Sequence, residues 1–210
     1  MKFIKKIQYN SPVILTYALI SLAALGLGRL TNGESTRLVF SVYRGPLTDP
    51  LAYVRLFAYV AGHADLPHYL NNFLIILLIG PVLEEKYGSR NTVFMILITA
   101  FVTGAVNMAF FNTALLGASG IVFMLILLGS FVNLKKGRIP VTLLLIMAVY
   151  IGREIADGIY LADNVSQLGH VIGGFCGALL GFFLNKDILF DKKTEVISES
   201  PPGEGDGSGL

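Results

Sequence analysis

The chain lacks tryptophan and contains a single cysteine, Cys176. One cysteine excludes a disulfide within the chain, and its position inside an apolar run favours a small packing residue over a reactive thiol. Without tryptophan, any belt of aromatic side chains at a membrane surface must consist of tyrosine and phenylalanine.

Charged residues are scarce as well. They make up 14% of the sequence, whereas apolar residues make up 54% and the mean hydropathy is +0.67. A soluble domain carries about 25% charged residues, so this composition predicts an all-α, polytopic membrane protein that contacts the lipid bilayer. The formal net charge of +2 gives no indication of a nucleic-acid partner.

Six apolar segments predict six transmembrane helices in one bundle over residues 13–186. The segments are 13–30, 68–84, 92–111, 115–134, 140–157 and 166–185. Residues 31–67 carry turn signals and an apolar stretch, 51–60, that Arg55 interrupts. That stretch is too short to span a bilayer, so we expect a partly embedded external loop. A basic segment, 1–12, precedes the bundle, and the polar tail, 187–210, is expected to be disordered.

The distribution of lysine and arginine predicts the orientation of the bundle. Eleven of these residues lie at one set of segment ends and five at the other. The positive-inside rule places the larger set, and with it both termini, on the cytoplasmic side. The membrane is expected to be a bacterial inner or cell membrane. The basic start is therefore interpreted as a cytoplasmic segment and not as a cleaved signal peptide.

Polar side chains in three of the segments lie at one depth. Ser119 precedes Lys135 by 16 residues, His170 precedes Lys186 by 16, and His68 precedes Glu84 by 16. Each separation corresponds to about 24 Å of helix, in a bilayer core of about 30 Å. These groups would meet in one layer near the external face. Polar groups inside a membrane usually mark function, and a serine beside a histidine suggests a nucleophile and its base.

Glycines flank this serine in the sequence Gly117-Ala118-Ser119-Gly120. They permit an unusual turn and put Ser119 near the start of a helix, where unpaired N–H groups favour a negatively charged oxygen. The alternative is that these small residues only allow two helices to pack closely.

A stripe of glycines follows His170. Gly173, Gly177 and Gly181 recur every four residues and form a smooth face that admits the backbone of a neighbouring helix. The expected neighbour is the helix that carries Ser119. The alternative for His170 is a structural hydrogen bond between helices.

A third polar cluster begins the second predicted span. His68 and Asn72 are four residues apart and share a helix face, and both side chains suit the stabilisation of an oxyanion. A metal site of His63, Asp65 and His68 is the weaker interpretation, because the spacing of the histidines is not that of a helical zinc site. Glu84 lies too deep for the serine layer and is interpreted as structural.

Together these residues resemble the rhomboid family of intramembrane serine proteases, over about 55–181. The shared pattern comprises His63, His68 and Asn72; Gly80 and Glu84; Gly117, Ser119 and Gly120; and His170, Gly173 and Gly177. Arg55 fits the arginine of the family's first loop. Two positions depart from the family: Val54 replaces the usual aromatic residue, and Phe123 replaces a tyrosine that stacks on the catalytic histidine.

The resemblance implies a catalytic dyad of Ser119 and His170, with an oxyanion hole formed by His68, Asn72 and the Ser119 backbone N–H. Gly117 and Gly120 would shape the turn, and Phe123, Gly173, Gly177 and His63 would support the site. The expected activity is cleavage of transmembrane segments in substrate proteins, without a metal or cofactor. A non-catalytic, client-binding relative and a small transporter are the alternatives, and the sequence does not give the oligomeric state.

Overall fold

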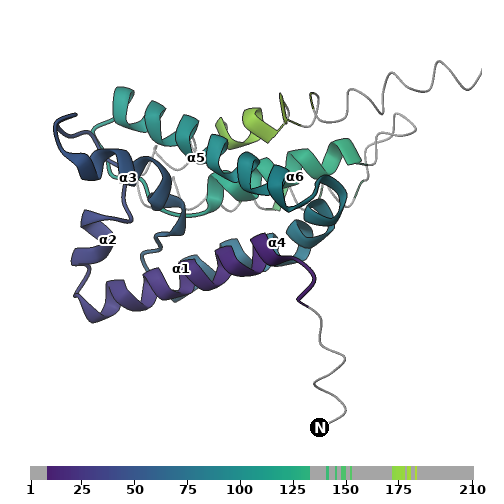
Figure 1. The fold of residues 1–210 in the computed structure, drawn as a ribbon, viewed down its shortest axis with the longest axis horizontal. Helices are drawn as coiled ribbons and strands as arrows, with labels where there is room; N and C mark the ends of the chain where they lie inside the picture. The colour runs from purple at the N-terminus through teal and green to yellow at the C-terminus, as the bar shows by residue number, and fades with distance from the viewer. Residues whose placement is uncertain are drawn as a thin grey trace, which may run out of the picture.

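The computed structural model describes residues 9–132 and, beyond them, 141, 145, 148, 149, 152, 172–177, 179, 180 and 183. Within these residues every regular element is helical (Figure 1), which confirms the predicted all-α class. In chain order the elements are α1 (Pro12–Leu30), α2 (Glu34–Leu38), α3 (Pro50–Ala58), the 3-10 turn η2 (Tyr59–Ala61), α4 (Leu66–Tyr87), α5 (Ser89–Phe110) and α6 (Ser119–Val132).

Three of the described helices are long and apolar enough to cross a membrane, namely α1, α4 and α5. They correspond to the first three predicted segments, and α6 covers much of the fourth. The fifth and sixth predicted segments fall largely outside the described residues, as do residues 1–8 and the tail, 187–210. Six spans therefore stay a prediction.

Short sequence signals determine where these helices begin and end. Asp49 and Asp65 cap α3 and α4, and their carboxylates accept hydrogen bonds from the N–H groups of Leu51 at 2.9 Å and His68 at 2.7 Å. Gly88 separates α4 from α5 with a φ of 81°, which glycine adopts without a steric penalty. The two long helices are thus joined by one residue.

Large apolar side chains cover the outside of the long helices. Many leucines and phenylalanines of α1, α4 and α5 are exposed, including Leu19, Leu22, Leu74, Leu78, Phe94 and Phe101. Soluble proteins rarely expose apolar patches of this extent. This outer surface is the one expected to face lipid hydrocarbon.

The helix α6 forms the core of the described bundle. Six of its residues, Ile121, Val122, Met124, Leu125, Ile126 and Leu128, are at most 1% exposed. A helix that is buried on every side is apolar on every side, and this helix carries no charged residue. It contacts α4, α5 and η2, so the residue at its start lies among several elements.

The external loop folds back onto these helices. In Figure 1, α2 and α3 gather at the end of α1 that lies away from the N-terminus. Arg55 of α3 is 2% exposed and pairs with Asp49, and it also donates to the Leu38 carbonyl at 3.2 Å. The guanidinium holds the pKa of the Asp49 carboxyl below its usual value. The stretch 51–60 is therefore most of a short helix and part of η2, and the two terminal guanidinium nitrogens of its one charged side chain are bonded inside the loop.

A buried carboxylate of α4 holds the start of α1. Glu84 is 3% exposed, and its two oxygens accept hydrogen bonds from the N–H groups of Val13 and Ile14, each at 3.0 Å. Ser89 donates to the same carboxylate at 2.7 Å. Since Ser11 makes no capping bond with its side chain, Glu84 supplies the missing cap across 70 residues of sequence. This explains the structural role predicted for Glu84.

Replacing Glu84 with Gln should destabilise the protein. The amide keeps one acceptor oxygen but turns the other position into an N–H donor that faces a backbone N–H. We expect a loss of about 1.5–3 kcal/mol, seen as a lower unfolding midpoint in detergent. The exposed neighbour Glu85 provides the control, because Glu85→Gln should leave the midpoint unchanged. Equal midpoints for Glu84→Gln and wild type would contradict the capping role.

Candidate active site

The first part of the candidate site is the start of α4. His68 is partly buried and Asn72 is 2% exposed. The two side chains lie one turn apart, and the Asn72 amide donates to the His68 carbonyl at 3.1 Å. Asp65 fixes the backbone of this turn through its bond to the His68 N–H. Both side chains therefore belong to the first two turns of α4, which Asp65 caps.

The turn before Ser119 packs directly on these two side chains. Gly117 has a φ of 118°, a conformation that side-chain-bearing residues rarely adopt. A Cβ atom at Gly117 would lie 2.7 Å from His68 Nε2 and 3.9 Å from Asn72 Nδ2. The structure thus brings His68, Asn72 and the Gly117 backbone together, two residues before Ser119, the residue that the matching depths place level with His68.

Ser119 is the first residue of α6 and is 9% exposed. The N–H of Val122 bonds to the Ala118 carbonyl at 3.0 Å, which marks Ala118 as the residue before the helix. The first N–H groups of a helix have no acceptor within it, and they carry the positive end of the helix dipole. Ser119 therefore lies at the positive end of the α6 dipole, which favours negative charge on an oxygen at this position.

Backbone hydrogen bonds tie the connection 111–118 to the external loop. Val42 and Leu115 form a β-bridge, with N–O distances of 2.9 and 2.8 Å. The N–H of Gly117 donates to the Tyr59 carbonyl at 3.0 Å. These bonds fix the path of the chain that leads into Ser119.

Two side chains that the sequence reasoning missed hold the same connection. The Asn107 amide donates to the carbonyls of Val42 at 3.3 Å and Thr113 at 3.1 Å, and so joins the two loops. Arg44 donates to the last carbonyls of α5 and to the Asn112 side chain at 3.0 Å. The available signal was the one amide side chain, Asn107, inside an apolar span.

His63 lies behind His68. Its ring is 1% exposed and contacts the rings of His68, Tyr69 and Phe73, with centroids 5.0, 5.5 and 5.7 Å away. Burial, with a smaller contribution from His68, lowers the pKa of His63 to about 4. His63 is therefore neutral at pH 7, and its ring packs against the His68 ring.

The glycine stripe packs against α6, as the sequence predicts. A Cβ atom on Gly173 would lie 2.1 Å from the Gly120 carbonyl oxygen, and one on Gly177 would lie 2.4 Å from that of Met124. Residues 172–177 are helical. His170 and Gly181 lie outside the described residues.

Phe123 follows Ser119 by one turn and is 6% exposed.

Among the residues that the structure describes, no group of three or more histidine, cysteine, aspartate or glutamate side chains could hold a metal ion. The roles of Ser119, His68, Asn72 and Phe123 in a reaction stay predictions.

Comparison with known proteins identifies related sequences. A family model described as the rhomboid domain matches residues 50–187. The chain is also 34% identical, over 130 residues, to RHOMBOID-like protein 4 of Arabidopsis thaliana. That alignment covers 58% of this chain and 32% of the relative, so the aligned region spans about a third of the relative's length. All predicted site residues lie within the range matched by the family model.

Adding a methyl group at Gly173 should force the two helices apart. The Gly173→Ala side chain would overlap the Gly120 carbonyl, and backbone cannot swing aside as a side-chain end can. We expect a loss of about 1–3 kcal/mol, measured as a lower midpoint of thermal unfolding in detergent. Gly26→Ala in α1 is the matched control, because no described atom lies within 4 Å of its added methyl. Similar midpoints for both variants would show that this packing is not tight.

Lowering the pH should destabilise the protein through His63. The folded pKa of about 4 lies below the ordinary value of 6.5, so the unfolded chain binds the proton first and stability falls as the pH drops from 6.5 towards 4. Between pH 7 and about pH 5 the expected loss is about 2 kcal/mol. Unfolding midpoints measured against pH should fall less steeply for His63→Phe. Parallel pH profiles for wild type and variant would assign the pH dependence to other groups.

Proposed function

The chain belongs to the rhomboid family, a multi-pass membrane family that includes serine proteases, and on that premise we propose that it is an intramembrane serine endopeptidase. Its substrates would be the transmembrane segments of other membrane proteins. One observation carries the proposal: the glycine turn before Ser119 lies against two side chains, His68 and Asn72, that can both donate hydrogen bonds. A nucleophile next to oriented donors is the arrangement that acyl transfer requires.

The general base of the proposal is His170. It precedes Gly173 by three residues in the sequence, and Gly173 contacts the backbone of Gly120, the residue next to Ser119. Three residues of sequence therefore separate the proposed base from a glycine that contacts the start of α6. Support for His170 comes from this register and from the family pattern.

The proposed reaction has two stages. His170 accepts the Ser119 proton while the hydroxyl oxygen attacks the carbonyl carbon of the scissile peptide bond. The carbonyl oxygen becomes an oxyanion, stabilised by donors from His68, Asn72 and the Ser119 N–H. The C–N bond then breaks, and the amine leaves with the proton held by His170. Water, deprotonated by His170, hydrolyses the ester and regenerates the serine.

The membrane limits which peptide bonds are available. A transmembrane helix satisfies its backbone groups internally, so a scissile carbonyl must leave its helix before Ser119 can attack. We expect cleavage in segments whose helix is weakened by glycine, proline or polar residues. The family resemblance adds a preference for small residues just before the cut.

The alternative function is that of a rhomboid-like protein that binds membrane clients without cleaving them. The name of the plant relative states a family and no reaction. Both functions would use the same helices to contact a client, and they differ only in whether Ser119 is reactive. A test of the serine therefore separates them.

We expect a fluorophosphonate probe to label the detergent-solubilised protein at Ser119. Ser119→Ala and His170→Ala should abolish labelling and also cleavage of a reconstituted transmembrane substrate, with losses of at least about a thousandfold. Ser21 is the matched control, because it is a fully buried serine on another helix, and Ser21→Ala should keep both activities. A folded wild type that neither reacts nor cleaves would favour the client-binding function, and cleavage by Ser119→Ala would refute the proposed nucleophile.

A further inference from the structure

The short turn η2 joins two parts of the candidate site through its backbone carbonyls. The Tyr59 carbonyl accepts a hydrogen bond from the N–H of Gly117 at 3.0 Å. The Ala61 carbonyl oxygen lies 3.3 Å from Nδ1 of His63. The first bond reaches the turn that leads into α6, and the second reaches a ring that packs against His68. The orientation of η2 therefore influences both the serine turn and the start of α4.

The third carbonyl of η2, that of Val60, is bonded by α1. The Tyr17 hydroxyl donates to it at 2.8 Å, and both residues are buried. The Tyr17 ring packs edge-on against Phe73 of α4, with the ring centroids 5.1 Å apart. Packing thus fixes the ring that presents the hydroxyl, and α1 is tied to η2 by a well-placed donor.

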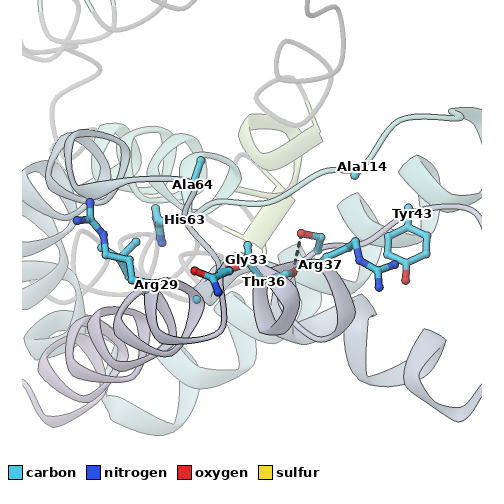
Figure 2. A pocket seen from close by; sticks show the side chains of 12 residues that line it. Arg29, Gly33, Thr36, Arg37, Tyr43, His63, Ala64 and Ala114 are labelled. Carbon is cyan, nitrogen blue, oxygen red and sulfur yellow. Dashed lines mark hydrogen bonds between the residues drawn. The ribbon is translucent and has the colours of Figure 1, made fainter.

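Farther along α1, a pocket of about 440 Å³ opens between this helix and the loops near the site. It is lined by Leu25 and Gly28 of α1, and by His63, Ala64 and Ala114 of the loops (Figure 2). Tyr17 precedes Leu25 by eight residues, which is about 12 Å along the helix axis. The hydrogen bond of Tyr17 therefore supports the loops at a level below the pocket, where α1 contacts η2 directly.

Loss of the Tyr17 hydroxyl would remove this donor from the Val60 carbonyl. A buried carbonyl without a hydrogen bond is costly in an apolar setting, so we expect η2 to rotate towards another donor. The three carbonyls belong to successive planar peptide groups of one short turn. A rotation at Val60 therefore also turns the carbonyls of Tyr59 and Ala61, which are the ones that hold the serine turn and His63.

We propose that Tyr17 is a positioning residue for the reaction, because it holds η2 and, through η2, the turn before Ser119. The inference rests on the proposed protease function. Tyr17 lies before residues 50–187, the range that the rhomboid family model matches. α1 thus contributes to catalysis from outside the matched range. Its contribution is to the alignment of Ser119 with the donors on α4, and so to kcat, and not to the binding of a substrate helix.

The test compares two tyrosines that each lose one buried hydroxyl. Tyr69→Phe is the matched control, because the Tyr69 hydroxyl donates at 3.1 Å to the Ala18 carbonyl of α1 and not to η2. Both variants keep their rings, and both should lower the unfolding midpoint in detergent. Assays are therefore run well below the two midpoints, so that both variants are folded.

Tyr17→Phe should lower kcat for a reconstituted transmembrane substrate by about tenfold, since a displacement of about 1 Å can cost about a hundredfold. KM should stay unchanged, and labelling of Ser119 by the fluorophosphonate probe should slow in parallel with kcat. Tyr69→Phe should leave kcat and labelling unchanged. A loss of kcat of equal size in the two variants, an unchanged kcat in Tyr17→Phe, or a loss confined to KM would overturn the proposal.

Hydrogen exchange separates failure of this inference from failure of the proposed function. The Gly117 N–H can exchange only when its bond to the Tyr59 carbonyl opens. Tyr17→Phe should speed exchange in residues 112–118 by about two- to tenfold, which corresponds to the loss of one hydrogen bond, and Tyr69→Phe should not. If wild type cleaves nothing, the protease function fails while this measurement still decides whether α1 holds the serine turn. Equal exchange in wild type and both variants would show that it does not.

Discussion

Close approach of backbone to backbone at the start of α6 is the constraint on which the candidate site depends. Gly173 contacts the carbonyl of Gly120, and Gly177 contacts that of Met124, at distances that leave no room for a Cβ atom. Gly117 leaves equally little room beside the His68 ring. Association of helices in lipid relies on tight packing, because burial of apolar surface there gains little. The glycines therefore both hold the bundle together and bring the serine to its neighbours.

Charged groups that lie inside this fold are used to complete backbone structure. Glu84 binds the first N–H groups of α1, and Arg55 binds the Leu38 carbonyl and the capping residue Asp49. A charge without partners in a low-dielectric setting is strongly destabilising. A charge that bonds to unpaired backbone groups offsets both its own desolvation cost and the cost of leaving those groups without partners. These two side chains therefore fix α1 and the external loop to the helices that carry the site.

Hydropathy predicted the long helices well, and its errors have physical causes. The second span was expected to end at Glu84, yet α4 continues to Tyr87 because that charge is buried against α1. The fourth was expected to begin at 115, but Leu115 belongs to the connection before α6. Its apolar side chain is buried there, beside the backbone bridge to Val42. Counting depth along the helices places His68 level with Ser119, and the structure puts the His68 ring against Gly117, two residues before that serine. The bonds of Asn107 could not be predicted, since a side-chain amide bound to a distant carbonyl leaves no periodic trace in the sequence.

The connection between α5 and α6 differs from an ordinary surface loop. Its backbone is bonded at Thr113, Leu115 and Gly117, which are alternate residues. Most loops accept insertions, because their chains are free to bulge into solvent. Here one added residue would exchange the bonded and unbonded positions, as a register slip does in a strand. The number of residues between Asn107 and Ser119 is therefore fixed by these bonds. A longer or shorter connection would move Ser119 relative to His68 and Asn72.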